Sequence, residues 1–135
     1  ISYSVYIMLG LGGKEMTLAH REGTAKLLNE INPFEIVFVT TVIFKRAPLK
    51  NLVRAKEFTR LAIKDVLAEE IYILESLENS TVIKATHKTN PLPLLAKFPE
   101  GKDDMLRKLK EYRDGNTEKE LRKNEMRKWQ VWDKE

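Results

Sequence analysis

The sequence predicts an α/β fold, and three consecutive segments carry this prediction. Residues 1–9 form an apolar run rich in aromatic and β-branched side chains, which is typical of a buried strand. Residues 17–31 show helical periodicity and end before Pro33, and residues 34–44 carry the strongest strand signal in the chain. A strand, a helix and a strand of these lengths form a βαβ unit, so we expect the two strands to be parallel.

Two details of this unit are also expected from its residues. Polar side chains are almost absent from the second strand until Thr40, which indicates that both of its faces are covered. Thr17 stands at the start of the helical periodicity, where a hydroxyl can cap the first free amides of a helix. We therefore expect Thr17 to be the N-cap of the first helix.

The middle of the chain predicts two further helices. A short one is expected around residues 49–55, and the clearest helix of the chain is expected over residues 64–77, where apolar side chains recur at helical spacing. Acidic side chains fall between these apolar positions, and we expect Glu69, Glu70 and Glu75 to form the solvated face of this helix.

The last third of the chain predicts one strand and two helices. Residues 80–86 form a third short strand, and the Pro-Leu-Pro segment after it prevents the strand from continuing. A helix is expected from residue 103 or 104 to about 112. Thr117 and Glu120 then form a capping-box pair for a final helix, whose candidate docking side chains are apolar: Leu121, Met126, Trp129 and Trp132.

Composition limits the classes of protein that need to be considered. The 135 residues carry a net charge of +4 and no cysteine, which excludes disulfides, thiolate metal sites and a cysteine nucleophile within the chain. No apolar run reaches the roughly 20 residues that cross a bilayer, and no signal peptide is visible, so we expect a cytoplasmic protein without membrane contact. Residues 102–135 hold 11 Lys/Arg and 9 Asp/Glu, a balance that makes nucleic-acid binding unlikely.

The glycine-rich turn after the first strand is the first candidate site. Gly10, Gly12 and Gly13 lie where the carboxyl end of a parallel strand meets a ligand in many α/β proteins. The third spaced glycine of the dinucleotide fingerprint is missing, so a tight strand-to-helix turn and a ligand-contacting loop remain equal alternatives.

Polar residues at the same predicted edge are the other candidates. Thr40 and Thr41 end the second strand, His87 follows the third strand, and His20 lies near the start of the first helix. The alternatives are strand propensity for the threonines and a solvated or packing role for the histidines. The chain has no Ser-His-Asp arrangement, no Walker loop and no metal-ligand spacing, so no catalytic or metal-binding residue is assigned.

The order of several short segments resembles the later part of radical SAM iron–sulfur oxidoreductases. The resemblance covers most of residues 5–112, and the order of the pieces carries it, since no single piece is specific. The matching residues are Ile7-Met8-Leu9-Gly10-Leu11-Gly12-Gly13-Lys14-Glu15, His20, Thr24-Ala25, Leu28-Asn29-Glu30-Ile31-Asn32-Pro33, Pro48-Leu49, Glu57-Phe58, Glu69-Glu70-Ile71, Leu74-Glu75-Ser76-Leu77, Ser80-Thr81-Val82, His87, Asn90-Pro91-Leu92-Pro93-Leu94, Phe98-Pro99 and Lys102-Asp103.

The resemblance implies a fold and two cofactors. Members of the family use a partial (β/α) barrel, in which a CxxxCxxC loop near the amino end holds a [4Fe-4S] cluster. The cluster cleaves S-adenosylmethionine reductively to a 5′-deoxyadenosyl radical. Residues 1–99 would then be the carboxyl-terminal portion of a half barrel with about three parallel strands and flanking helices, and residues 100–135 a helical extension. Cofactor contacts would come from Gly10, Gly12, Gly13, Thr40 and His87.

Two departures from the family pattern shape the functional prediction. The cluster cysteines are absent, and Arg46-Ala47 stands where many relatives have a Gly-Thr pair before Pro-Leu. Because the chain also starts with a strand at Ile1, we expect it to be a piece of a longer enzyme. We expect it to be inactive by itself and to bind neither cofactor stably.

The expected partners follow from the same prediction. They are a missing cluster-binding amino-terminal half and, through the open edge of the first strand, other copies of the chain. The alternative is a stand-alone α/β binding or scaffolding domain without chemistry. A nucleic-acid accessory domain, based on the basic last helix, is a third interpretation.

Overall fold

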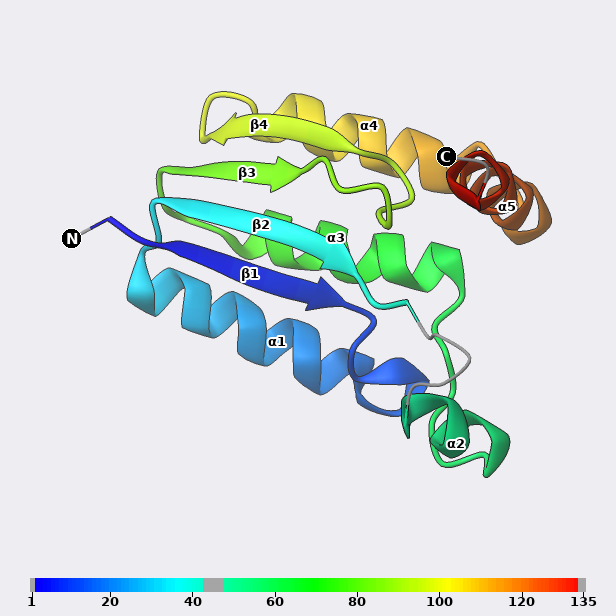
Figure 1. Ribbon diagram of the computed structural model, residues 1–135. Helices are drawn as coiled ribbons and strands as arrows, with labels where there is room; N and C mark the ends of the chain where they lie inside the picture. Colours follow the sequence, from blue (N-terminus) through cyan, green and yellow to red (C-terminus); the bar gives the residue numbers. More distant parts are fainter. Residues whose placement is uncertain (1, 43–47, 134–135) are drawn as a thin grey trace.

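A four-stranded sheet with helices packed on one face forms the protein (Figure 1). The computed structural model describes residues 2–42 and 48–133, with side chains up to residue 128. The elements are β1 (Ser4–Leu9), α1 (Gly13–Ile31), β2 (Glu35–Thr40), α2 (Pro48–Arg54), α3 (Ile63–Ser76), β3 (Thr81–Ala85), β4 (Leu94–Phe98), α4 (Lys102–Asp114) and α5 (Glu118–Asp133). The predicted α/β class is confirmed. Among the described residues, no helix is long and apolar enough to cross a membrane.

The strands follow the chain order β1-β2-β3-β4, and the first three are parallel. The parallel βαβ arrangement of the first two strands is therefore confirmed. The prediction of about three strands is wrong, because β4 adds a fourth strand antiparallel to β3. The Pro-Leu-Pro segment ends one strand as predicted, but it also reverses the chain, so that Leu94 pairs with Ala85 and Phe98 with Thr81.

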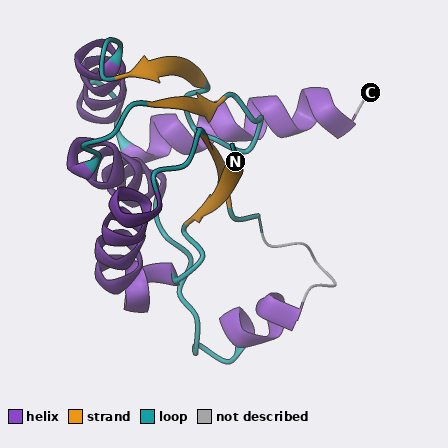
Figure 2. Cartoon of the chain, turned by 90° about the vertical axis from the view of Figure 1, so that its left-hand side faces the viewer, coloured by secondary structure: helices purple, strands orange, loops and turns teal. Residues whose placement is uncertain are grey.

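Among the described residues, the helices that pack against the sheet lie on one of its faces. In Figure 2, α1, α3 and α4 stand on one side of the strands. Side chains that point toward these helices, such as Ile7 and Phe38, are buried, whereas Tyr6 on the opposite face is 70% exposed. The expectation that both faces of the second strand are covered is therefore wrong within the described residues, because Val37 and Val39 remain partly exposed.

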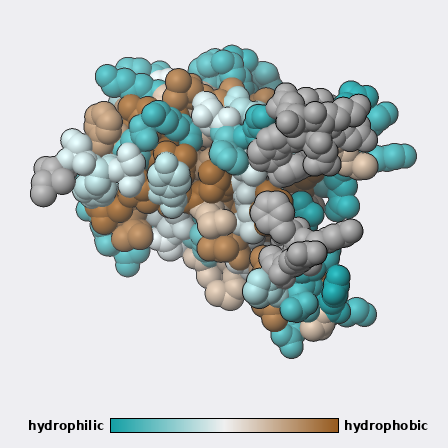
Figure 3. Space-filling model, viewed as in Figure 1, coloured by the Kyte–Doolittle hydropathy of each residue, from teal (hydrophilic) through white to brown (hydrophobic). Residues whose placement is uncertain are grey.

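The uncovered face, which we call the open face, is largely apolar. Its side chains alternate with the buried ones along each strand, and Figure 3 shows hydrophobic residues across its centre. An ion pair between Lys84 and Glu35, with 2.9 Å between Nζ and Oε2, lies on this face. The apolar members of the open face are Tyr6, Met8, Val37, Val39, Val82 and Leu95.

One hydrophobic core joins the helices to the buried side of the sheet. Leu9, Phe38 and Ile83 of the sheet pack with α3, and Leu109 of α4 and Leu121 of α5 belong to the same cluster. The predicted docking of the last helix through Leu121 is confirmed, since this side chain is 1% exposed, but the same prediction for Met126 is wrong, because that side chain is 63% exposed. The side chains of the two tryptophans that were expected to help lie outside the described residues.

Helix and strand boundaries differ from the prediction by a few residues. The short predicted helix is α2, and the long predicted helix is α3. Thr117 immediately precedes α5, and the Glu120 amide donates to its hydroxyl at 3.2 Å, so this half of the predicted capping box is confirmed. β2 ends at Thr40, whereas the strand was predicted to continue to residue 44. Residues 43 and 44 of that prediction lie outside the described residues, and so does Ile1 of the first predicted strand.

Candidate functional site

A cavity of about 600 Å³ lies at the carboxyl ends of β1 and β2, between the start of α3 and the first turns of α5. In Figure 1, α5 stands at this end of the sheet, beside the arrowheads of the parallel strands. Such an edge is the usual ligand site of open α/β sheets, and the volume falls in the range of small-molecule sites. The cavity is lined by Gly10, Thr40, Thr41, Val42, Phe58, Arg60, Leu61, Ile63, Val66, Thr89, Pro91, Glu118, Arg122, Glu125 and Met126.

The five residues predicted to contact a cofactor divide into two groups. Gly10 and Thr40 line the cavity. Gly12 and Gly13 lie at the start of α1 and are not among the residues that line the cavity. His87 is exposed, and its Nδ1 lies 2.9 Å from the Thr89 hydroxyl, so it reaches the cavity wall only through this neighbour.

The two positive-φ glycines serve different purposes. Gly10 has a φ of 76° and turns the chain away from β1, and an added Cβ would find ordinary contacts there. Gly13 has a φ of 64°, and an added Cβ would lie 2.8 Å from both Phe58 Cε2 and the Thr59 carbonyl oxygen. The Lys14 amide also donates to Thr59 O at 2.8 Å. Gly13 therefore lets the segment that carries Phe58 pack tightly on the start of α1.

Glu69 of α3 anchors the glycine turn from behind. Its carboxylate accepts hydrogen bonds from the Gly10 amide at 2.9 Å and the Thr17 hydroxyl at 2.7 Å, and His20 Nε2 lies 3.4 Å from its Oε1. Glu69 is fully buried, so its predicted place on a solvated face is wrong. The predicted N-cap role of Thr17 is also wrong, because α1 begins at Gly13 and the hydroxyl turns toward this carboxylate.

Glu70 is the second buried carboxyl group of α3, and it too was wrongly predicted to be exposed. Neither of its oxygens has a hydrogen-bond partner among the described residues. Burial without a partner disfavours the ionised form, and it raises the pKa of Glu70 to about 8. The helical spacing did contain a signal for this, because Glu70 falls on the same helical stripe as Leu67 and Leu74.

Asn90 ties the ends of β2 and β3 together beside the cavity. It is fully buried, and its Nδ2 donates to Phe38 O at 2.7 Å and to Ala85 O at 3.1 Å. Its Oδ1 accepts a hydrogen bond from the Thr40 hydroxyl at 2.9 Å. In this network the Thr40 hydroxyl already uses its hydrogen as a donor to Asn90. The sequence alone marks Asn90 only as part of the family resemblance.

Helix α5 is fastened at both ends of its cavity-lining part. At its start, the Glu118 carboxylate accepts hydrogen bonds from the Ile63 amide at 3.0 Å and the Lys64 amide at 2.9 Å. Ten residues further on, Lys128 Nζ donates to Asn90 O at 2.7 Å and to Glu125 Oε1 at 2.6 Å. The first half of α5 therefore forms a fixed wall of the cavity.

The pKa values of the two carboxyl groups in this wall are shifted in opposite directions. Burial opposes ionisation of Glu118, but the amides of Lys64 and Ile63 and the Arg122 guanidinium outweigh it and lower the pKa of this carboxyl. Burial dominates at Glu125 and raises its pKa above the ordinary value, although Lys128 and the charge of Arg60 act against this.

Metal binding finds no support in the described part of the chain. No group of three or more His, Asp or Glu side chains is placed to hold an ion there. The full sequence contains no cysteine, so the chain cannot supply the thiolates of a [4Fe-4S] cluster. The residues present therefore do not fit a cluster, whereas the cavity has the size and location of a small-molecule site.

Comparison with known proteins identifies no relative. No protein-family model matches the chain, and no match is found among curated proteins or solved structures.

Proposed function

We propose that this chain is the carboxyl-terminal part of a radical SAM iron–sulfur oxidoreductase, whose missing part carries the cluster and completes the barrel. In this proposal the full enzyme is cytoplasmic and cleaves S-adenosylmethionine to a 5′-deoxyadenosyl radical. The chain itself contributes one wall of the active site, at the carboxyl ends of its parallel strands.

The observation that carries the proposal is the one-sided covering of the sheet. In (β/α) barrels, helices pack outside the strands, and the alternate side chains of each strand fill the interior. Here α1, α3 and α4 cover one face, while Tyr6 and Met8 on the other are 70% and 41% exposed. An apolar open face of this kind is what the interior of a divided barrel would present.

The position of the sheet edges supports the same proposal. β4 is antiparallel and ends the parallel series on one side, whereas β1 lies at the other edge without a further strand partner among the described residues. The parallel series could therefore continue at the free edge of β1.

The cavity lies where barrel enzymes place their active sites, and Gly10 and Thr40 of the expected cofactor contacts line it. Because no cysteine is present, we propose that the chain alone is inactive and binds no cluster. Its contribution to the enzyme would be binding and orientation, through the glycine turn that Glu69 anchors.

The proposal is tested on the reading frame that encodes this chain. We expect an in-frame extension upstream of Ile1 with a CxxxCxxC motif. The longer protein, reconstituted anaerobically with iron and sulfide, should form 5′-deoxyadenosine from S-adenosylmethionine and dithionite, and its cysteine-to-alanine variant should not. A start codon a few residues before Ile1 would contradict the proposal, as would a stoichiometric cluster on this chain alone.

A stand-alone binding or scaffolding domain is the second candidate. The observation in its favour is that the chain has one continuous core and a cavity built entirely from its own residues. If this alternative is correct, the reading frame should have no cluster motif, and the 135-residue chain should bind a small molecule without any added half.

A further inference from the structure

We infer that the cavity binds an organic anion with an apolar body, such as an aromatic carboxylate or phosphate ester, and that Arg60 holds the anionic group. This inference rests on the proposal that the cavity is a ligand site, and it names the chemical class of the ligand. It does not depend on cluster chemistry.

The charges around the cavity leave a positive group available. Among the described residues, the charged side chains that line it are Arg60, Arg122, Glu118 and Glu125. Glu125 is paired with Lys128 at 2.6 Å. Glu118 forms an ion pair with Arg122 at 3.1 Å and accepts hydrogen bonds from the amides of Ile63 and Lys64.

Both carboxylates are thus satisfied by groups of the protein. Arg60 has no hydrogen bond or ion pair within residues 2–42 and 48–128. Its charge acts on Glu125, but Lys128 already binds that carboxylate, so the N–H donors of Arg60 have no acceptor there. Arginine offers five donors in a planar fork that fits carboxylate and phosphate groups. An exposed arginine in the wall of a cavity is suited to a ligand whose charged group stays near solvent.

The hydroxyls of Thr40 and Thr41 in the cavity wall are not offered to a ligand. Thr41 Oγ1 is shielded from solvent and has no hydrogen-bond partner among the described residues, so a molecule in the cavity does not reach it. The Thr40 hydroxyl already donates to Asn90. An ionic contact with Arg60, and not one of these two hydroxyls, therefore orients the ligand.

The remaining walls fit an apolar body. Phe58, Leu61, Ile63, Val66 and Met126 line the cavity together with Val42 and Pro91. Most small-molecule sites combine such walls with a few polar groups that set orientation. The apolar walls and the Arg60 guanidinium together define an amphipathic anion.

Two fluorescent probes that differ by one charge test this inference. 8-Anilinonaphthalene-1-sulfonate carries an aromatic body and a sulfonate, and N-phenyl-1-naphthylamine is the same body without it. We expect the anionic probe to bind the full chain more tightly, and Arg60→Gln to weaken it about tenfold, the size of one charge-assisted hydrogen bond. Arg60→Gln should not change binding of the neutral probe.

Control variants separate the cavity from other sites. Arg127→Gln removes an exposed arginine of α5 that does not line the cavity, and it should leave both probes unaffected. Tyr6→Ser and Leu95→Ser reduce the open face, and they should leave the anionic probe bound in the cavity. Circular dichroism of each variant is the check that it is folded.

Competition distinguishes the two sources of negative charge. 1-Naphthoate and 1-naphthyl phosphate are tested for displacement of the anionic probe, and the better competitor identifies the preferred group. If neither compound displaces the anionic probe, the inference is overturned. Equal effects of Arg60→Gln and Arg127→Gln on the anionic probe also overturn it. If both probes bind the cavity equally, the anion inference fails while the cavity remains a ligand site. If neither probe binds there, the inference and the proposed ligand site fail together.

Discussion

Glu69 and Glu70 are neighbours on α3, and both are fully buried, yet their surroundings differ completely. Glu69 accepts hydrogen bonds from a backbone amide and a hydroxyl and lies beside His20, whereas Glu70 has no partner among the described residues. A buried carboxylate with partners stabilises its surroundings, and one without partners lowers the free energy of unfolding when it ionises. Each residue therefore makes a separate prediction.

Replacement of Glu69 by alanine should strongly destabilise the protein. The Gly10 amide and the Thr17 hydroxyl would lose their acceptor inside the protein, and we expect the free energy of unfolding to fall by about 3 kcal/mol. Urea unfolding measures the change.

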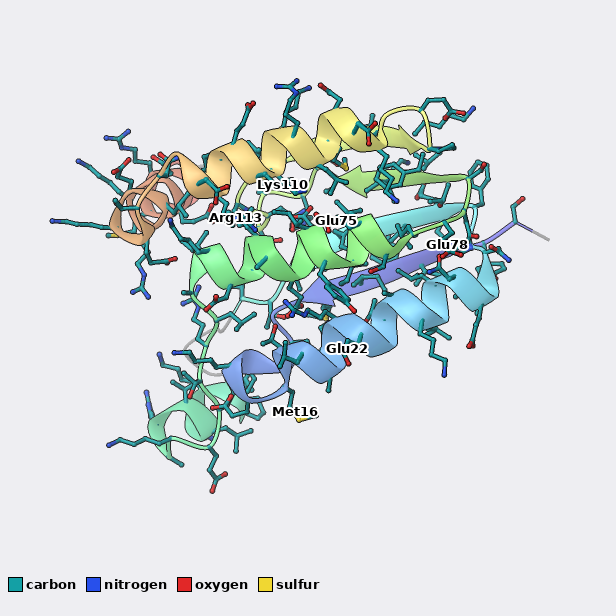
Figure 4. All side chains as sticks on the ribbon, turned by 180° about the vertical axis from the view of Figure 1, so that it is seen from behind. Met16, Glu22, Glu75, Glu78, Lys110 and Arg113 are labelled. Atoms are coloured by element: carbon teal, nitrogen blue, oxygen red, sulfur yellow. The ribbon has the colours of Figure 1, made fainter. Side chains whose placement is uncertain are left out.

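The matched control for Glu69→Ala is Glu75→Ala on the same helix. Glu75 lies between α3 and α4 beside Lys110, with 2.8 Å between the charged atoms, and both side chains are close to half exposed (Figure 4). Loss of this surface ion pair should cost less than about 1 kcal/mol. Equal losses for the two variants would contradict the anchoring role of Glu69.

Glu70 should make stability depend on pH. Its pKa of about 8 in the folded protein lies above the ordinary value of 4.5, so its contribution to stability is complete below pH 4.5. Between pH 4.5 and 8 the unfolded chain releases this proton first, and stability should fall by up to about 1.4 kcal/mol per pH unit. Glu70→Gln should remove this slope and be more stable than the wild type at pH 8.

The measurement for Glu70 is urea unfolding of both proteins from pH 4 to pH 8.5. Other titrating groups are common to the two chains, so the difference between them isolates Glu70. If the stability difference between wild type and Glu70→Gln stays constant over this range, the carboxyl is not held in its neutral form.

Helix α1 illustrates how single glycines act at the scale of an element. Its first residue, Gly13, has a positive φ and is closely surrounded by the segment that carries Phe58 and Thr59. Gly23 lies in the middle of the same helix, where an added Cβ would meet no atom within 4 Å. The two positions therefore respond oppositely to the same substitution.

Gly13→Ala should destabilise the protein for two reasons. Alanine would be strained at the positive φ of this position, and its methyl group would displace the neighbouring segment from α1. Gly23→Ala should stabilise it by about 0.5–1 kcal/mol, since alanine favours a helix interior. Thermal unfolding compares the two variants with the wild type. Stabilisation by Gly13→Ala would contradict the packing described for the start of α1.

At the scale of the whole molecule, the sheet presents an apolar open face and an edge at β1. His20 Nε2 lies 3.0 Å from Met8 O and covers part of that edge. The rest of β1 has no strand beside it within the described residues, and such edges promote pairing between chains. In the proposed enzyme, the missing part of the barrel would cover both surfaces.

The chain alone should therefore self-associate, and Tyr6→Lys should reduce this. A lysine at position 6 places a charge on the open face and on the edge strand itself. Light scattering over a range of protein concentrations measures the average mass. Leu52→Lys on α2, also an exposed apolar residue, is the control and should leave the mass unchanged. A sharp monomer mass for the wild type at high concentration would contradict this prediction.

Sequence reasoning located the helices and the first three strands because periodicity, prolines and capping residues act over a few positions. It placed Gly10 and Thr40 at one edge of a parallel sheet, and both line the cavity. It missed Arg60, in the connection between α2 and α3, and Glu125 of α5 as wall residues, because both segments reach the cavity only when the chain folds back over the strand ends. No local pattern contains that information.

The amino-acid sequence by itself determined the α/β class, the parallel βαβ start and the glycine turn, since these follow from local side-chain patterns and from the geometry of short connections. Only the tertiary structure decided that β4 runs antiparallel, that one face of the sheet stays open and that Glu69 is an anchor. The contact between Glu69 and Gly10 joins residues 59 positions apart. Whether a charged side chain is buried by such a long-range contact depends on which elements pack together. Helical periodicity alone therefore placed Glu69 on the wrong side of its helix.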